Sequence, residues 1–217
     1  MIEIKHVAFD LDGVLIDSVN AMEKSWGKAM EKLNYNYDYK FDEFKLLIGY
    51  PFYKVLSKLK IPKKDYKKVH QLFMKNSILN IKYIKKYRNV DNCLLSFKKK
   101  NIKISLVTSK NKIATKKILK HLFKKISFDS IVTSGDIKKG FEKPKPDPIL
   151  KACKIVNIKT NNTVYVGDMY VDNKSAKNAG VLFFFAKWGY GTQNNYKHKF
   201  LNLIDLKKFI LGALNGS

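Results

Sequence analysis

Two apolar segments, far apart in the chain, each lead directly into acidic residues. Residues 7–9 precede Asp10-Leu11-Asp12-Gly13, and residues 164–166 precede Gly167-Asp168, with Asp172 four positions later. Short apolar runs of this kind are typical of buried strands, and in open α/β sheets ligands collect beyond the carboxyl ends of the strands. Because Mg²⁺ prefers carboxylate and carbonyl oxygens, we expect both groups to form one divalent-metal site that serves phosphate chemistry. The alternative is that these carboxylates are helix caps and turn residues, positions that Asp and Gly favour.

Hydrophobic periodicity predicts strands that alternate with helices, on both sides of a purely helical region. The fold class that follows is α/β: a doubly wound parallel sheet, interrupted early by an all-helical insert. We place the α/β core in residues 1–17 and 89–217 and the insert in residues 18–88. Ser18 is expected to cap the first helix of the insert, and Asp147 the helix after a Pro-rich loop. The expected strands cover 3–9, 102–107, 128–133, 163–166 and 181–186, and the expected helices 18–32, 41–48, 51–59, 63–87, 91–100, 111–122, 148–156, 171–179 and 205–213.

Length and composition limit the class of protein. With 217 residues, of which 45% are hydrophobic, the chain suits one large domain or a domain with a smaller insert. No apolar run reaches the roughly 18 residues of a membrane span, and the first apolar run is too short for a signal peptide and is broken by Asp10. Cys93 and Cys153 are far apart, which suits small buried side chains better than a disulfide framework. We therefore expect a cytoplasmic protein without a membrane partner.

The net charge of +25 raises the question of a nucleic-acid partner. Only one of the 43 basic residues, Arg88, is arginine, whereas recognition of base edges and phosphates relies strongly on arginine. The lysines are spread along the chain in short groups, and the accompanying Asn, Ile, Tyr and Phe are typical of A/T-rich codons. Nucleic acid is therefore a disfavoured partner, and a basic binding protein with an idle site stays as the alternative from another class.

Four motifs in a fixed order give the sequence a specific resemblance. They are Asp10-Leu11-Asp12-Gly13-Val14-Leu15-Ile16-Asp17-Ser18, Leu106-Val107-Thr108-Ser109-Lys110, Lys143-Pro144-Lys145-Pro146-Asp147-Pro148 and Gly167-Asp168-Met169-Tyr170-Val171-Asp172. With them the chain resembles, over almost its full length, the haloacid dehalogenase (HAD) superfamily phosphatases of the phosphoglycolate-phosphatase-like branch. The resemblance implies a Rossmann-like core, a helical cap formed by the insert, and Mg²⁺-dependent hydrolysis of a small phosphorylated metabolite. The motifs are specific for the superfamily and say little about the substrate.

The resemblance also implies the roles of the acidic residues. Asp10 would be the nucleophile that forms an aspartyl-phosphate, and Asp12 would protonate the leaving alcohol and then deprotonate the hydrolytic water. The metal ligands would be Asp10, Asp168 and the main-chain carbonyl of Asp12. Asp172 would support the site, through water or through Lys143.

The phosphoryl group would be bound by residues of the second and third motifs. The resemblance implies that Thr108 donates its hydroxyl to a phosphoryl oxygen, that the Ser109 amide assists, and that Lys143 neutralises the nucleophile and the transferring group. In the insert, residues 49–54 are our candidate for a specificity loop, with Tyr53 or Lys54 touching the substrate. A plain helix–helix connection is the alternative for that segment.

Several alternatives remain open from the sequence. Family dehalogenases generally lack a carboxylate at the position of Asp12, so its presence favours phosphate esters. A phosphonate-cleaving relative would use a cap lysine as a Schiff base, and nothing marks out one lysine of the insert. A phosphomutase would retain both Asp10 and Asp12 and stays as the alternative enzyme, and the protein is expected to be a monomer or a homodimer. Trp188-Gly189-Tyr190-Gly191 is interpreted as packing and a turn.

Overall fold

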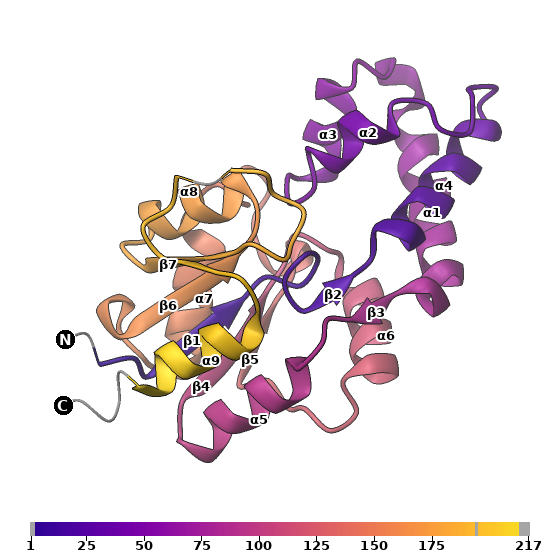
Figure 1. Ribbon diagram of the computed structural model, residues 1–217. Helices are drawn as coiled ribbons and strands as arrows, with labels where there is room; N and C mark the ends of the chain where they lie inside the picture. Colours follow the sequence, from indigo (N-terminus) through magenta and orange to yellow (C-terminus); the bar gives the residue numbers. More distant parts are fainter. Residues whose placement is uncertain (1–2, 194, 213–217) are drawn as a thin grey trace.

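Six parallel strands form the central sheet of the protein (Figure 1). The computed structural model describes residues 3–193 and 195–212. The strand order is β5-β4-β1-β6-β7-β8, so β1 lies between β4 and β6. Phe9, the last residue of β1, is level with Leu106 of β4 and Val166 of β6. The residues that follow these three strands therefore meet at the edge of the sheet formed by the carboxyl ends of the strands, which is called the sheet edge below. The strands are β1 (His6–Phe9), β4 (Lys103–Val107), β5 (Ser130–Val132), β6 (Thr163–Gly167), β7 (Leu182–Ala186) and β8 (Lys199–Phe200).

Helices cover both faces of the sheet because successive side chains of a strand point to opposite faces. Val7 and Phe9 belong to one hydrophobic cluster together with apolar residues of α5, α6 and α9. Ala8 belongs to a second cluster with residues of α7 and α8. The sheet is thus doubly wound, as the sequence predicts. The helices are α5 (Val90–Lys99), α6 (Lys112–Leu122), α7 (Asp147–Val156), α8 (Tyr170–Asn178) and α9 (Leu203–Gly212), with 3₁₀ turns η3 (Ser134–Asp136) and η4 (Thr160–Asn162).

The early part of the chain forms a separate group of helices beyond the edge of the sheet (Figure 1). These helices pack around Trp26, which is fully buried and donates its Nε1 hydrogen to the Tyr39 carbonyl at 2.6 Å. Two residues of the core, Met169 and Val171 at the start of α8, join the same cluster. The helical region is therefore packed directly onto the edge where the strands end. Its elements are α1 (Val19–Glu31), α2 (Phe41–Lys45), α3 (Phe52–Lys58), η1 (Lys63–Asp65), α4 (Tyr66–Leu79) and η2 (Asn80–Tyr83).

The two segments that connect this helical region to the sheet pair with each other. β2 (Ile16–Asp17) and β3 (Lys85–Lys86) form a short antiparallel ladder in which Ile16 is level with Lys86. The predicted helix over 63–87 is therefore wrong at its end. The helix α4 gives way to a 3₁₀ turn at Asn80, whose side chain is buried and donates to Ser25 Oγ at 3.0 Å, and the chain then becomes extended to pair with β2.

The fold class is confirmed, and several local expectations need correction. Ser18 occupies the cap position of α1 but makes no capping hydrogen bond, because its hydroxyl is used in the site described below. Asp147 is the first residue of α7 and not its cap, which is Pro146. The strand β8 is absent from the prediction, and residue 213 of the predicted last helix lies outside the described residues. Among the helices in the described ranges, none is long and apolar enough to cross a bilayer.

Candidate active site

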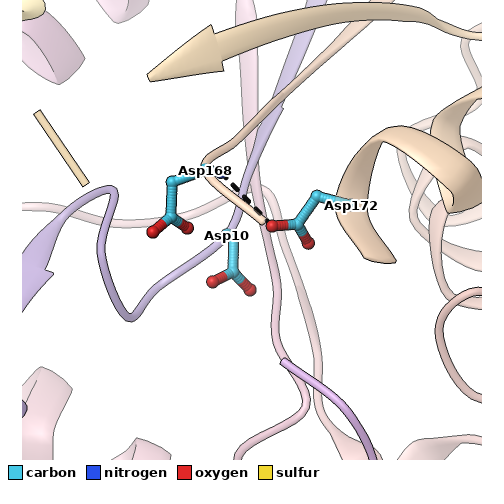
Figure 2. A group of neighbouring side chains, drawn as sticks. All are labelled: Asp10, Asp168 and Asp172. Carbon is cyan, nitrogen blue, oxygen red and sulfur yellow. Dashed lines mark hydrogen bonds between the residues drawn. The ribbon is translucent and has the colours of Figure 1, made fainter. Parts of the chain in front are cut away.

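Three carboxylates from two distant parts of the chain converge at the sheet edge (Figure 2). Asp10 follows β1 directly, Asp168 follows β6, and Asp172 lies in the first turn of α8. One carboxylate oxygen from each lies within 4.8 Å of the others. Asp10 is 5% exposed and the other two are 1% exposed. The structure therefore brings together the acidic groups that the sequence places about 160 positions apart.

Lys143 is the cation that faces this group. Its Nζ donates to Oδ1 of Asp10 at 2.7 Å and to Oδ1 of Asp172 at 2.9 Å, and the residue is 1% exposed. Burial lowers the pKa of Lys143, but the two carboxylates more than offset this, so its pKa stays above the usual value and the ammonium is retained. Burial also raises the pKa of Asp10 to about 7; Lys143 opposes the rise, and Asp172 and Asp12 add to it.

Asp168 carries the least compensated charge in the site. Its Oδ2 accepts the backbone N–H of Tyr190 at 2.7 Å, whereas its Oδ1 is buried and has no hydrogen-bond partner among the described residues. Burial, followed by repulsion from Asp172 and Asp10, raises the pKa of Asp168 well above its usual value. A buried carboxylate oxygen without a partner is costly unless a cation neutralises it. This oxygen, with the neighbouring carboxylates, is the donor set that a hard divalent cation such as Mg²⁺ requires.

Three glycines leave the space into which Asp168 fits. A Cβ added to Gly13, where φ is +86°, would lie 2.1 Å from Asp168 Oδ2. A Cβ on Gly189 would lie 2.3 Å from Asp168 Cβ, and one on Gly191 would lie 1.8 Å from the Asp168 carbonyl oxygen. The position of the Asp168 side chain therefore depends on the absence of side chains at three positions.

Asp172 fixes the turn that carries Asp168. Its Oδ2 accepts the backbone N–H groups of Met169 at 3.0 Å and Asp168 at 3.3 Å, the latter drawn in Figure 2. Its Oδ1 accepts from Lys143 and, at 3.2 Å, from the hydroxyl of the buried Tyr165. Both oxygens of Asp172 therefore hold the turn at residues 168–169 and Lys143. This arrangement suits the supporting role expected for Asp172.

The Asp12 carboxylate has its own partners, outside the group of Asp10, Asp168 and Asp172. Its Oδ1 accepts the hydroxyl of Ser18 at 2.5 Å, and its Oδ2 lies 3.2 Å from Nζ of Lys110. Tyr190 completes this network, because its hydroxyl accepts the backbone N–H of Ser18 at 2.7 Å. The carboxylate is thus oriented by a hydroxyl and an ammonium at the wall of a cavity that also reaches Asp10.

Thr108 and Ser109 form the loop after β4. Thr108 is 5% exposed, and its Oγ1 accepts the backbone N–H of Lys110 at 3.1 Å, an arrangement that leaves its proton for a bound anion. The Ser109 hydroxyl instead donates to the Gly49 carbonyl of the helical region at 2.6 Å.

A cavity of about 540 Å³ lies over these residues and extends to the helical region. Asp10, Asp12, Thr108 and Lys143 line it on the core side. Of the two cap residues named from the sequence, Tyr53 lines the cavity, whereas Lys54 is outside its lining. Lining residues on the opposite side are Gly49, Tyr50, Pro51, Phe52, Phe73 and Met74. A volume of this size is typical of pockets for small molecules.

Sequence reasoning missed the part that residues 188–191 play. Trp188 does pack as expected, with its Nε1 donating to the Val14 carbonyl at 3.0 Å. Gly189, Tyr190 and Gly191, however, surround Asp168 rather than forming only a turn. The available signal was their place directly after β7, at the same sheet edge as the acidic residues. Lys110 stood within a recognised motif without a role, and its pairing with Asp12 depends on side-chain geometry.

Comparison with known proteins agrees with this arrangement. Residues 7–186 match the family of haloacid dehalogenase-like hydrolases. The chain belongs to this family. It is 32% identical to a phosphoglycolate phosphatase of Aquifex aeolicus over 190 residues, which cover 87% of each chain. It is 29% identical to the pyrophosphatase PpaX of Bacillus mycoides over 192 residues, 86% of this chain and 85% of the relative.

The fold of this HAD-like hydrolase is also found in experimentally solved structures of other proteins. A haloacid dehalogenase-like family hydrolase from Streptococcus pneumoniae superposes with a TM-score of 0.82 at 18% identity, covering 96% of this chain and 99% of the other. The family assignment and the expectation of a hydrolase among phosphatase-like relatives are therefore confirmed.

Proposed function

We propose that this HAD-like hydrolase is a Mg²⁺-dependent phosphatase that removes the phosphoryl group from a small phosphomonoester. The observation that supports it most is the buried group of Asp10, Asp168 and Asp172 with Lys143, beside Thr108 and open to a cavity. Relatives of the chain are named phosphoglycolate phosphatase and pyrophosphatase. Phosphoglycolate and pyrophosphate are therefore the first substrates to test.

Asp10 is the nucleophile in this proposal. Lys143 engages its Oδ1, which leaves the second oxygen to attack phosphorus. As the bond between phosphorus and Asp10 forms, the bond to the leaving oxygen breaks, and Asp12 supplies the proton that the leaving alcohol needs. The product of this half-reaction is an aspartyl-phosphate on Asp10, with the hydroxyl of Thr108 and the ammonium of Lys143 facing the transferred oxygens.

The second half-reaction returns the enzyme to its starting state. Asp12, now deprotonated, takes a proton from a water molecule that attacks phosphorus, and the bond between phosphorus and Asp10 breaks to release inorganic phosphate. Ser18 and Lys110 hold the Asp12 carboxylate, so the same group serves as acid and as base from one position. Asp172 keeps Lys143 beside Asp10 and shapes the Asp168 turn.

Mg²⁺ would be held by the carboxylates of Asp10 and Asp168 and by the main-chain carbonyl of Asp12. When bound, the cation neutralises charge on the phosphoryl oxygens and on the carboxylates. The unpaired Oδ1 of Asp168 supports this placement.

We propose that residues 18–88 act as a cap domain over the core. The cap would exclude bulk water and select the substrate. Tyr53 lines the cavity, and Nζ of Lys139 from the core lies 5.4 Å from the centre of its ring. Tyr53 is therefore the stronger of the two candidate specificity residues, and Lys54 stays a prediction from the sequence.

Replacing the nucleophile provides the direct test. Asp10→Asn should lower phosphate release at least about 10³-fold, because an amide cannot form the acyl-phosphate. The measurement is phosphate release from a panel of phosphorylated metabolites, including phosphoglycolate, pyrophosphate and hexose phosphates, with Mg²⁺ and with excess chelator. Asp42→Asn, at a side chain that is 95% exposed, is the matched control and should leave turnover unchanged.

The same panel separates the alternatives. A phosphomutase would convert a hexose phosphate into its isomer without a matching release of phosphate. A nucleic-acid-binding protein would be retained with DNA or RNA on a filter at physiological salt and would hydrolyse none of the panel. Undiminished hydrolysis by the Asp10 variant would exclude the proposed mechanism.

A further inference from the structure

Ser109 connects the phosphate-binding loop to the cap. It directly follows Thr108 in the loop after β4. Its Oγ donates to the carbonyl oxygen of Gly49, 60 positions earlier, at 2.6 Å. A short hydroxyl–carbonyl hydrogen bond of this kind is well formed. One residue of the candidate phosphate site is thus bonded to the backbone of the cap.

The conformation of Gly49 makes this contact possible. Its φ is +93°, a region that side-chain-bearing residues rarely adopt. A Cβ at this position would lie 2.8 Å from Cγ2 of Val171 and 3.8 Å from Cβ of Met169. The Gly49 backbone therefore lies between Ser109 on one side and the start of α8, which carries Asp172, on the other.

A second contact joins the same loop to the cap. Asn111 donates from Nδ2 to the sulfur of Met74 in α4 at 2.8 Å, while its Oδ1 caps α6 by accepting the Ala114 N–H at 2.9 Å. The Asn111 bond reaches a flexible thioether, a weak acceptor. The Ser109 bond reaches a fixed backbone carbonyl and is the stronger of the two.

We propose that Ser109 is a positioning residue that holds the cap closed when the phosphate site is occupied. The proposal rests on the phosphatase function proposed above and adds a residue through which the site and the cap are coupled. Its hydroxyl proton is committed to Gly49, so the residue acts on the substrate through cap position. An anion that orders the 108–111 loop then also orders residues 47–50, and release of the anion loosens them.

Hydrogen exchange tests this coupling without requiring turnover. In the wild type with Mg²⁺, inorganic phosphate should slow amide exchange in residues 47–50. Ser109→Ala should speed that exchange about fivefold, the effect of losing one ordinary hydrogen bond, and should weaken the response to phosphate. Ser109→Thr keeps the hydroxyl and should restore both. Ser96→Ala is the matched control, because it removes a hydroxyl–carbonyl hydrogen bond of 2.7 Å from an exposed site on α5.

Kinetics distinguish a positioning role from direct binding of phosphate. With p-nitrophenyl phosphate, Ser109→Ala should lower kcat/KM about fivefold, mainly through KM. Gly49→Ala should have a similar effect, because its Cβ collides with Val171 and displaces the carbonyl. The double variant should be no worse than Gly49→Ala alone, since both changes break one contact.

Three results would overturn the proposal. They are unchanged exchange in residues 47–50 of Ser109→Ala, a fall in kcat without any change in cap exchange, and additive effects in the double variant. If Ser109→Ala does not fold, amide exchange in residues 47–50 is measured in Ser109→Thr and Gly49→Ala instead. The proposal then requires wild-type exchange in Ser109→Thr and faster exchange in Gly49→Ala. Absence of phosphate release from the wild type would defeat the proposed function alone, because the exchange experiment uses inorganic phosphate.

Discussion

Asp168 shows how much of this site depends on one side chain. It has an unpaired buried oxygen, a single backbone donor from Tyr190, and two neighbouring carboxylates. Burial and repulsion from the neighbouring carboxylates disfavour the charged form of Asp168 in this region of low dielectric, and the Lys143 ammonium offsets this only in part. The sequence predicts the presence of Asp168 at the site, but its unpaired oxygen follows from the packing of the glycines around it.

A divalent cation should therefore stabilise the folded protein. At about 100-fold excess over its Kd, Mg²⁺ should raise Tm by about 5–10 °C. Asp168→Asn replaces a carboxyl whose charged form is disfavoured without the metal, so the metal-free Tm should not fall while the Mg²⁺ shift should largely vanish. Thermal unfolding with Mg²⁺ and with chelator measures both quantities. An undiminished Mg²⁺ shift in the variant would show that the cation binds elsewhere, and Asp42→Asn is the control.

His6 is a buried titratable residue that takes no part in the site. Its Nε2 lies 2.7 Å from Ser105 Oγ and its Nδ1 lies 3.2 Å from Thr163 Oγ1. The Thr163 hydroxyl donates to the Lys159 carbonyl, so Nδ1 carries the hydrogen and Nε2 accepts from Ser105. The imidazole is thus satisfied as a neutral group.

Acid should destabilise the protein through this residue. Burial lowers the pKa of His6 to about 4, with Asp129 opposing the fall. Below about pH 6.5 the unfolded chain binds a proton that the folded chain does not, so stability drops as pH falls from 6.5 to 4, by about 3 kcal/mol. The raised pKa of Asp10 acts in the opposite direction over part of this range. The quantity to measure is therefore the difference between two proteins: in urea unfolding at several pH values, the stability of the wild type should fall relative to that of His6→Asn as pH drops from 6.5 to 4. Equal slopes in the two proteins would refute the assignment.

At the scale of elements, the sequence predicted the strands and helices whose hydrophobic pattern lies within the segment itself. The strands β1, β4, β6 and β7 are short and mostly apolar. The helices α5, α6 and α7 have amphipathic spacing. It failed where pairing with a distant segment decides the structure. β8 and β3 are two residues each and exist only through their partners β7 and β2. The acidic residues of the site were found because they lie on or shortly after strand ends, whereas both contacts of Tyr190, its N–H to Asp168 and its hydroxyl to the Ser18 N–H, depend on how the loop after β7 folds back.

The loop after β7 should tolerate no side chain where it passes Asp168. In Gly189→Ala the new Cβ would lie 2.3 Å from Asp168 Cβ and 2.6 Å from the Gly13 carbonyl oxygen. Either the loop or Asp168 must shift, so phosphate release should fall at least about tenfold and stability by about 1–3 kcal/mol. Gly212→Ala, with nothing within 4 Å of its added Cβ, is the control and should be neutral or slightly stabilising. Wild-type activity in Gly189→Ala would mean that the loop around Asp168 can shift to accept the new Cβ without loss of function.

At the scale of the whole molecule, the protein has a net charge of +25, whereas its candidate active site is acidic. Such a field attracts anions from solution and is screened by salt. The sequence left open whether the lysines are functional, because nothing in their spacing marks a binding patch. The pairing of Lys143 and Lys110 with site carboxylates shows that at least two have particular partners.

The field predicts a salt effect on substrate capture. Raising ionic strength from about 0.05 to 0.5 M should lower kcat/KM severalfold for an anionic phosphomonoester, with kcat little changed, because the Debye length shrinks below about 10 Å. Steady-state kinetics at fixed free Mg²⁺ measure this. A salt-independent kcat/KM would indicate that the lysines do not guide the substrate.

The antiparallel ladder between β2 and β3 has a further consequence for how this fold can vary. Both ends of the helical region leave the sheet side by side, with Ile16 level with Lys86. A replacement segment would need only to begin and end at this one junction, and the strand register of the α/β core would not depend on what lies between. A different helical segment could therefore be inserted at this junction while the residues that follow β1, β4 and β6 keep their places.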